Sequence, residues 1–444
     1  MHLTDIFGLD PLLRSPLITC TILGAVSALL GVFVIFRRQA LVGETLSHAC
    51  YPAIIIGLVL TEIYDLYYLP TWITLLLAIT SAMLAIWTIE WLQQRYVLSS
   101  DTALSTVLVS SFAFSLLFLS TTQFAFPTVW RELQSLLVGQ AATISQQYMN
   151  IAVAISTFAM IYISLFRKHL ELELFDITFT HVHQLISHVF RWGFILLFII
   201  IMLLGIRFMG VLLMSALFIF PTISARLIVS RFSHLLIAAA SIGALCGYGG
   251  VVLSHTTALL TEHLGTTTVW LPTGPLIILL LSAIFSVLLF IAPQEGMITK
   301  LWRRYYFQKR CQRENVIKAL WKECDKRDAT QLEQTMLQSI LPIPPIRIKK
   351  MLRSLQKEGY LLIRKHVIIM TKSGLSYGQH LVRLHRLWEL YLVEYCDIPK
   401  DRVHPSAEEM EHILSPEIEA RLTSLLLYPT TDPHQQPIPP AIHE

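Results

Sequence analysis

The chain changes its pattern of hydrophobic and polar positions near residue 300. Before that point, apolar runs long enough to cross a bilayer alternate with short polar connections. The runs fall near residues 17–36, 41–60, 71–92, 102–120, 147–166, 192–206, 209–225, 235–253 and 276–292. The pattern predicts a polytopic transmembrane helical bundle of about nine spans over residues 1–293, in an α-class fold.

After Pro293 the chain has the periodicity of a protein that folds in water. Residues 294–312 form a basic linker, which we expect to be a cytoplasmic stalk or the start of a helix. Arg313–Cys324 follows with apolar residues on one side, the spacing of an amphipathic helix.

A helix-turn-helix with a wing is predicted next, over residues 313–384. Thr330–Leu341 and Ile346–Lys357 both have helical spacing, and the PIPP sequence between them stops a helix because proline cannot continue one. The segment Tyr360–Met370 alternates and is rich in β-branched residues, which predicts two paired strands. Residues 385–444 are predicted to form a separate helical domain.

Charge follows the same division. Hydrophobic residues make up 54% of the 444, with a mean hydropathy of +0.59, far above a soluble protein. Residues 300–384 carry 19 Lys and Arg against 6 Asp and Glu, whereas residues 385–444 carry 4 against 11. A basic module therefore precedes an acidic one, which favours a polyanion partner for the first and cations for the second.

Basic residues also predict the orientation of the membrane half. With the N-terminus outside, most of its Lys and Arg face the cytoplasm, as the positive-inside rule requires. We therefore expect a multi-pass protein of the cell inner membrane with its C-terminal part in the cytoplasm, where DNA is found.

Glu44 and His48 are the polar residues of the membrane half that most need explanation. They lie one helical turn apart at the head of an apolar run, and ionisable groups at membrane depth are costly unless they have a function. A carboxylate and an imidazole are suitable transient ligands for a divalent transition metal. A structural hydrogen bond between helices is the alternative interpretation.

The sequence contains no G-x-x-x-x-G-K-[ST] motif, the usual loop for nucleotide phosphates. Transport energy is therefore expected to come from a separate ATPase subunit. Capture of the ion outside the membrane is expected to depend on an extracytoplasmic metal-binding protein. The chain itself is predicted not to be an enzyme.

The second helix of the predicted helix-turn-helix is basic. Its candidate DNA-binding residues are Arg347, Lys349, Lys350 and Arg353. A basic helix after a turn is suited to phosphate contacts and insertion into a groove. A basic patch beside the membrane, facing anionic lipid head groups, is the alternative.

The acidic end carries a cluster of candidate metal ligands. HRLWE places His385 and Glu389 one turn apart, and VHPSAEEMEH supplies His404, Glu408, Glu411 and His412. Imidazole and carboxylate donors without a thiolate favour Mn²⁺ or Fe²⁺, with Zn²⁺ possible. The alternative for each pair is a solvated helix face.

Three stretches of the membrane half resemble the signatures of zinc/manganese/iron-type ABC importer permeases: FRRQALVGETLSHACYP (Phe36–Pro52), GVLLMSALFIFPTISARL (Gly210–Leu227) and LPTGPLIIL (Leu271–Leu279). The resemblance implies that Glu44 and His48 lie on the metal pathway. It also implies a second permease subunit, the same or homologous, and contact between Pro221–Leu227 and the ATPase.

The segment His385–Pro439, with the helix-turn-helix before it, resembles the diphtheria toxin repressor family. The resemblance implies a dimer that binds operator DNA. It assigns a primary metal site to Glu408, Glu411 and His412, and a second site to His385, Glu389 and His404. The ligand that this family supplies from its first helix falls at Asn315, with Glu314 as the alternative.

Together these features predict the permease subunit of an importer for Mn, Fe or Zn, fused to a metal-dependent transcriptional repressor. The alternative is a transporter whose cytoplasmic domain senses the ion and gates transport without binding DNA. Because a tethered repressor would search DNA poorly, proteolytic release around residues 294–312 is a further expectation.

Overall fold

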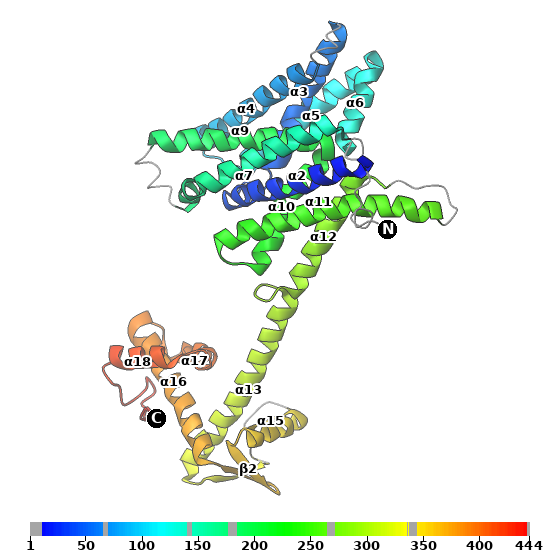
Figure 1. Cartoon of the computed structure of the whole chain (residues 1–444). Helices are drawn as coiled ribbons and strands as arrows, with labels where there is room; N and C mark the ends of the chain where they lie inside the picture. Colours follow the sequence, from blue (N-terminus) through cyan, green and yellow to red (C-terminus); the bar gives the residue numbers. More distant parts are fainter. Residues whose placement is uncertain are drawn as a thin grey trace. The chain divides into compact units, whose positions relative to one another are not determined.

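The computed structural model describes residues 11–64, 70–139, 144–175, 184–263, 271–334, 336 and 344–441. The chain divides into two compact units, Met1–Lys300 and Leu301–Glu444, and each is considered by itself (Figure 1).

The first unit is a bundle of long apolar helices. They are α2 (Pro11–Phe36), α3 (Val42–Ile63), α4 (Pro70–Tyr96), α5 (Ser100–Ala125), α7 (Gln146–Phe175), α9 (Gln184–Met209), α10 (Val211–Ile228), α11 (Phe232–His263) and α12 (Thr273–Ile291). In the described part of the chain, eight helices are long and apolar enough to cross a membrane. Helix α10 supplies a shorter apolar helix over Leu213–Ile228. The prediction of about nine spans is confirmed.

One helix of this unit was not predicted. Helix α6 (Pro127–Val138) has only 12 residues and carries charge, so it has neither the length nor the composition of a span. It packs against α3, α5, α9 and α10. The hydroxyl of Tyr51 on α3 donates a hydrogen bond to the carbonyl of Leu133 on α6, at 2.9 Å.

Small residues allow α2 to pack closely against α11 at the centre of the bundle. A Cβ atom added at Gly24 would lie 2.4 Å from the carbonyl oxygen of Gly243. At Gly31, a Cβ would lie 2.0 Å from the carbonyl oxygen of Phe218 on α10. Close backbone approach of this kind is how helices associate in lipid, where apolar side chains gain little by leaving their surroundings.

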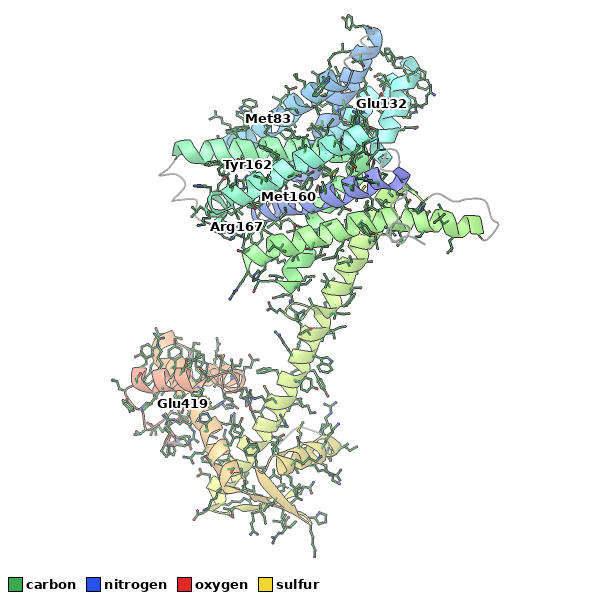
Figure 2. All side chains as sticks on the ribbon, in the orientation of Figure 1. Met83, Glu132, Met160, Tyr162, Arg167 and Glu419 are labelled. Atoms are coloured by element: carbon green, nitrogen blue, oxygen red, sulfur yellow. The ribbon has the colours of Figure 1, made fainter. Side chains whose placement is uncertain are left out.

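Several charged residues of this unit are paired. Arg37 lies 2.7 Å from Glu173, and Arg191 pairs with Glu90. On α7, labelled in Figure 2, Arg167 bonds both Glu171, at 2.7 Å, and the hydroxyl of Ser233 on α11, at 2.8 Å. Pairing of this kind lowers the cost of keeping ionisable groups in an apolar bundle.

The second unit begins within a long helix, α13 (Met297–Arg327). The basic stretch that the sequence left open as a stalk or a helix start is therefore helical from Met297. Val316, Ile317 and Leu320 of α13 form an apolar core with Ile348 and Leu352 of α15 (Pro345–Lys357).

A three-stranded antiparallel sheet completes this core, in the order β1-β3-β2. The predicted wing is present as β2 (Leu361–Arg364) and β3 (Val367–Met370). The predicted helix Thr330–Leu341 is wrong at its start, because Gln331–Glu333 forms β1 and pairs with β3. Buried Leu332 lies opposite Ile368 in this pairing. Most of the remainder of that predicted helix, with the first proline of PIPP, lies outside the described residues.

Helices α16 (Lys372–Cys396), α17 (His404–Met410) and α18 (Pro416–Leu425) form the last part of the unit, with a 3-10 turn at Lys400–Arg402. Leu387, Leu390, Leu426 and Ile438 make a small separate core. Arg383 of α16 binds Glu419 of α18, labelled in Figure 2, at 2.8 Å, which fixes the two helices together.

Candidate metal centre and nucleic-acid interface

Glu44 and His48 lie one turn apart on α3, and both are half-buried. The His48 ring packs edge-on against Phe112 of α5, with centroids 5.1 Å apart. Within the described ranges, neither side chain has a hydrogen-bond or ion-pair partner. The pair is thus half-exposed, and no polar group in the described part of the chain holds its donor atoms.

His385, Glu389 and His404 form a compact triangle of donor atoms. His385 Nε2 lies 3.2 Å from Glu389 Oε1 and 3.0 Å from His404 Nδ1, and His404 Nδ1 lies 2.9 Å from Glu389 Oε1. Helix α16 supplies the first two residues from one face, and His404 begins α17. In the described part of the chain, these three side chains form the group of His, Cys, Asp or Glu residues whose donor atoms lie close enough together to share one ion.

The triangle is buried on one side and open on the other. The side chains of His385 and Glu389 are 4% and 3% exposed, whereas His404 is 54% exposed. Two imidazole nitrogens and one carboxylate oxygen, with an open side, suit Mn²⁺, Fe²⁺ or Zn²⁺. The residues therefore fit a divalent transition-metal ion, with access through His404.

The other ring nitrogen of His385 is held by a carboxylate. His385 Nδ1 lies 2.6 Å from Glu411 Oε2, and the Lys318 ammonium donates to both oxygens of Glu411, at 2.7 and 2.8 Å. A carboxylate that accepts the Nδ1 proton leaves Nε2 as the ligand atom and fixes the ring, as in many metal sites.

These contacts set the pKa values of the buried groups. Burial favours the neutral form of Glu389, but hydrogen bonds from His385 and His404 outweigh it and lower its pKa to about 2. Burial would likewise raise the pKa of Glu411. The hydrogen bond from His385 and the charge of Lys318 outweigh burial, so the pKa of Glu411 is lowered. At His385 burial would lower the pKa, yet the bonds to both glutamates raise it above 6.5.

Of the three residues expected to form a primary site, only Glu411 and His412 lie close together, with His412 Nε2 3.6 Å from Glu411 Oε1. Glu408 is 54% exposed and lies 3.5 Å from His404 Nε2, on the open side of the triangle. His412 faces α13 instead: its Nδ1 lies 2.6 Å from Glu314 Oε2, and its Nε2 lies 3.1 Å from Asn315 Oδ1.

Glu314 is the centre of this second buried group. Besides His412, it accepts hydrogen bonds from Tyr377, at 2.6 Å, and from Arg310, at 2.7 Å. Burial would raise the pKa of Glu314, but these three donors lower it to about 2. Sequence reasoning named Glu314 and Asn315, but it missed Lys318, Arg310 and Tyr377.

Helix α15 presents an exposed basic face. Ile348, Met351, Leu352 and Leu355 are buried, which turns the charged residues outward. Those exposed residues are Arg347, Lys349, Lys350, Arg353 and Lys357. Lys365, at the turn of the wing, has a φ of 56° and is also exposed.

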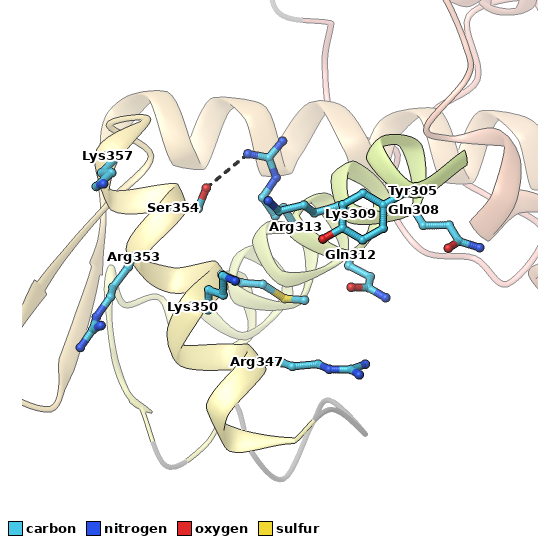
Figure 3. Close-up of a pocket in the computed structure, with 11 residues that line it drawn as sticks. Tyr305, Gln308, Lys309, Gln312, Arg313, Arg347, Lys350, Arg353, Ser354 and Lys357 are labelled. Atoms are coloured by element: carbon cyan, nitrogen blue, oxygen red, sulfur yellow. Dashed lines mark hydrogen bonds between the residues drawn. The ribbon is translucent and has the colours of Figure 1, made fainter. Parts of the chain in front are cut away.

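The basic face continues into a pocket of about 640 Å³ between α15 and α13 (Figure 3). Arg347, Lys350 and Arg353 line it from α15, and Lys309 and Arg313 from α13. Arg313 donates to the hydroxyl of Ser354, at 3.4 Å, so the two helices are joined at this point. A surface with this density of positive charge is suited to a chain of phosphates.

Known proteins are similar to both units of this chain. Residues 371–440 match the metal binding and dimerisation domain of iron dependent repressors. A "Probable metal transport system membrane protein" of Chlamydia trachomatis is 29% identical over 97% of this chain and 96% of its own length. The "Manganese transport system membrane protein MntC" of Bacillus subtilis is 26% identical over 91% and 89%.

A shorter relative matches the first unit. The "Zinc transport system membrane protein TroC" of Treponema pallidum is 30% identical, over 66% of this chain and 94% of its own. The solved structure of PsaBC from Streptococcus pneumoniae is 21% identical over 66% of this chain and 95% of its own, with a TM-score of 0.51, and shares the fold. Residues 10–292 match the ABC 3 transport family model, so the chain belongs to that family and carries a repressor-type metal binding domain after it.

Proposed function

We propose that the first unit is the permease of an importer for a divalent transition metal, and that the second unit binds the same class of ion and, with it, operator DNA. The observation that carries the sensing half is the triangle of His385, Glu389 and His404, with donor atoms 2.9 to 3.2 Å apart. Its nitrogen and oxygen donors favour Mn²⁺ or Fe²⁺, with Zn²⁺ next.

Glu44 and His48 are proposed to form a transient site for the transported ion. Two observations support this site. Both side chains are half-buried on α3 without a polar partner in the described structure, and relatives are named for manganese and zinc transport. Assembly with an ATPase subunit, an extracytoplasmic metal-binding protein and a second permease subunit is proposed because the chain belongs to an ABC transport family and its sequence contains no nucleotide-binding loop.

DNA is the proposed partner of the second unit, which the positive-inside rule predicts to lie in the cytoplasm. The exposed cations of α15, the exposed wing turn and the basic pocket support it. A dimer is supported by apolar side chains left exposed on and after α18, at Ile418, Leu425, Leu427 and Tyr428. Two copies would present two basic helices to one duplex.

The test measures DNA binding by the detergent-solubilised full chain. The DNA comes from upstream of its own gene, and fluorescence anisotropy reports binding with and without Mn²⁺. We expect Mn²⁺ to tighten binding. If no DNA binds at low salt with Mn²⁺, Fe²⁺ or Zn²⁺, the gating alternative replaces this proposal. In that case His404→Ala should change the dependence of uptake on internal metal.

Release of the second unit is a separate part of the proposal. Residues 301–310 of α13 are all exposed in the described structure, so local unwinding of this part of the helix would give a protease access to it. An immunoblot against the C-terminal region should find a soluble fragment in cells. A signal confined to membranes would remove this part and leave the rest intact.

A further inference from the structure

The sequence predicts two metal sites in the second unit. In the described structure, only the site of His385, Glu389 and His404 has an open side where an ion could enter. At the other, a lysine ammonium occupies the position where a cation would bind. Lys318 Nζ lies 2.7 and 2.8 Å from the two oxygens of Glu411 and 3.4 Å from His385 Nδ1. The Lys318 side chain is 8% exposed, and that of Glu411 is fully buried.

We propose that Lys318 takes the place of a second metal ion, so that the second unit binds one divalent ion and Glu411 positions His385 rather than binding metal. This rests on the proposed function of the His385, Glu389 and His404 triangle. Both Glu411 oxygens already accept from the ammonium, and a divalent ion on the same carboxylate would be repelled by that charge at close range.

His412, another donor of the predicted primary site, is also occupied, whereas Glu408 is 54% exposed. Both ring nitrogens of His412 have oxygen partners, Glu314 at 2.6 Å and Asn315 at 3.1 Å. Glu314 is in turn matched by the guanidinium of Arg310. The two buried carboxylates of this group therefore have two cations from α13, which satisfies them without an ion.

Lys318 has a second consequence for the triangle. Its ammonium holds Glu411, Glu411 accepts from His385 Nδ1, and His385 Nε2 is thereby aimed at Glu389 and His404. Lys318 is thus a positioning residue that acts on the ion through two side chains. Removing partners of this outer kind typically changes metal affinity by about 10- to 100-fold.

The experiment counts Mn²⁺ bound per full chain in detergent, by equilibrium dialysis and elemental analysis. Variants are compared side by side, so that any ion held in the membrane unit cancels. We expect His404→Ala to lose one ion, Lys318→Gln to gain one, and Lys318→Arg, which keeps the charge, to match the wild type. Glu411→Gln should keep the wild-type count with affinity about 10- to 100-fold weaker.

Each outcome has one meaning. Equal counts for Lys318→Gln and wild type overturn the replacement of an ion by Lys318, whereas no loss in His404→Ala overturns the proposed triangle itself. If Lys318→Gln fails to fold, the wild type decides alone. Mn²⁺ electron paramagnetic resonance should then show the sharp lines of isolated ions, and broadening by a neighbouring ion would refute the proposal.

Discussion

Two carboxylate and imidazole pairs with the same one-turn spacing occur in different surroundings. Glu44 and His48 on α3 are half-buried, and their side chains have no polar partner in the described structure. His385 and Glu389 on α16 are nearly fully buried, and each is held by further polar groups. The same spacing of a carboxylate and an imidazole therefore does not imply the same function.

The difference suits the two proposed roles. A transport site must bind an ion well enough to admit it and weakly enough to release it, so few and unsupported ligands are suitable. A sensor must hold its ligand geometry before the ion arrives, which needs supporting hydrogen bonds to the ligands. Lys318 and Glu411 provide that support at His385.

The largest expected effect is on transport. Glu44→Gln or His48→Ala should abolish Mn²⁺ uptake by the assembled importer, because the apolar surroundings offer no replacement ligand. Glu62→Gln, the same change on the same helix, is the matched control, since Glu62 bonds Thr128 at 2.6 Å and is not on the proposed pathway. Uptake at the wild-type rate in both variants would exclude the pathway assignment.

The next effect concerns metal affinity in the second unit. Glu389→Gln removes the anionic ligand of the triangle, and we expect a loss of Mn²⁺ affinity of about 100-fold or more, measured by titration calorimetry. Glu394→Gln on the same helix is exposed and should bind like the wild type. Unchanged affinity in Glu389→Gln would mean that the triangle is only a hydrogen-bonded cluster.

DNA binding should respond more modestly. Replacing both Lys349 and Lys350 with Ala should weaken binding to operator and random DNA alike, and lower the salt slope by roughly one unit for each phosphate that is no longer neutralised. Lys400→Ala, exposed on the 3-10 turn, is the control. An unchanged salt slope in the double variant would place the DNA surface elsewhere than on α15.

The smallest effect is a dependence on pH. Glu389 and Glu411 raise the pKa of His385 above 6.5, although burial acts the other way. An ion must displace that proton, so Mn²⁺ affinity should begin to fall already above pH 6.5 as the pH is lowered. Without metal the sign is opposite: the raised pKa stabilises the fold at low pH, and that stability is lost as pH rises through the folded-state pKa.

Thermal unfolding in chelator should therefore occur at a lower temperature at about pH 8 than at about pH 6, and His385→Gln should flatten the difference. Stability that is equal at both pH values in the wild type would contradict the arrangement of charges around His385.

Local patterns predicted most of the fold. Every apolar run of the first half became a helix, because lipid requires helical hydrogen bonding within each span. Helix α6 and strand β1 were missed for different reasons. The first is too short and polar to stand out, and the second exists only because β3 pairs with it from a distant part of the chain, at Gln331 and Ile369.

The candidate sites show the same limit. Helical spacing correctly brought His385 and Glu389 to one face, but spacing along residues 404–412 does not reveal what lies opposite them. His412 meets Glu314 on α13, 98 positions earlier, and Glu411 meets Lys318, 93 positions earlier. Contacts between such distant helices depend on the packing of the whole unit, so the cation beside Glu411 was not predictable from the motif.

The most direct test of the account is a titration of DNA binding against Mn²⁺ for the wild type and His404→Ala. His404 is exposed, so its replacement removes a ligand without disturbing the core. The account predicts that wild-type affinity for operator DNA rises with Mn²⁺, and that His404→Ala keeps only the weaker, metal-independent attraction of the basic helix. The same metal dependence in both proteins would contradict it.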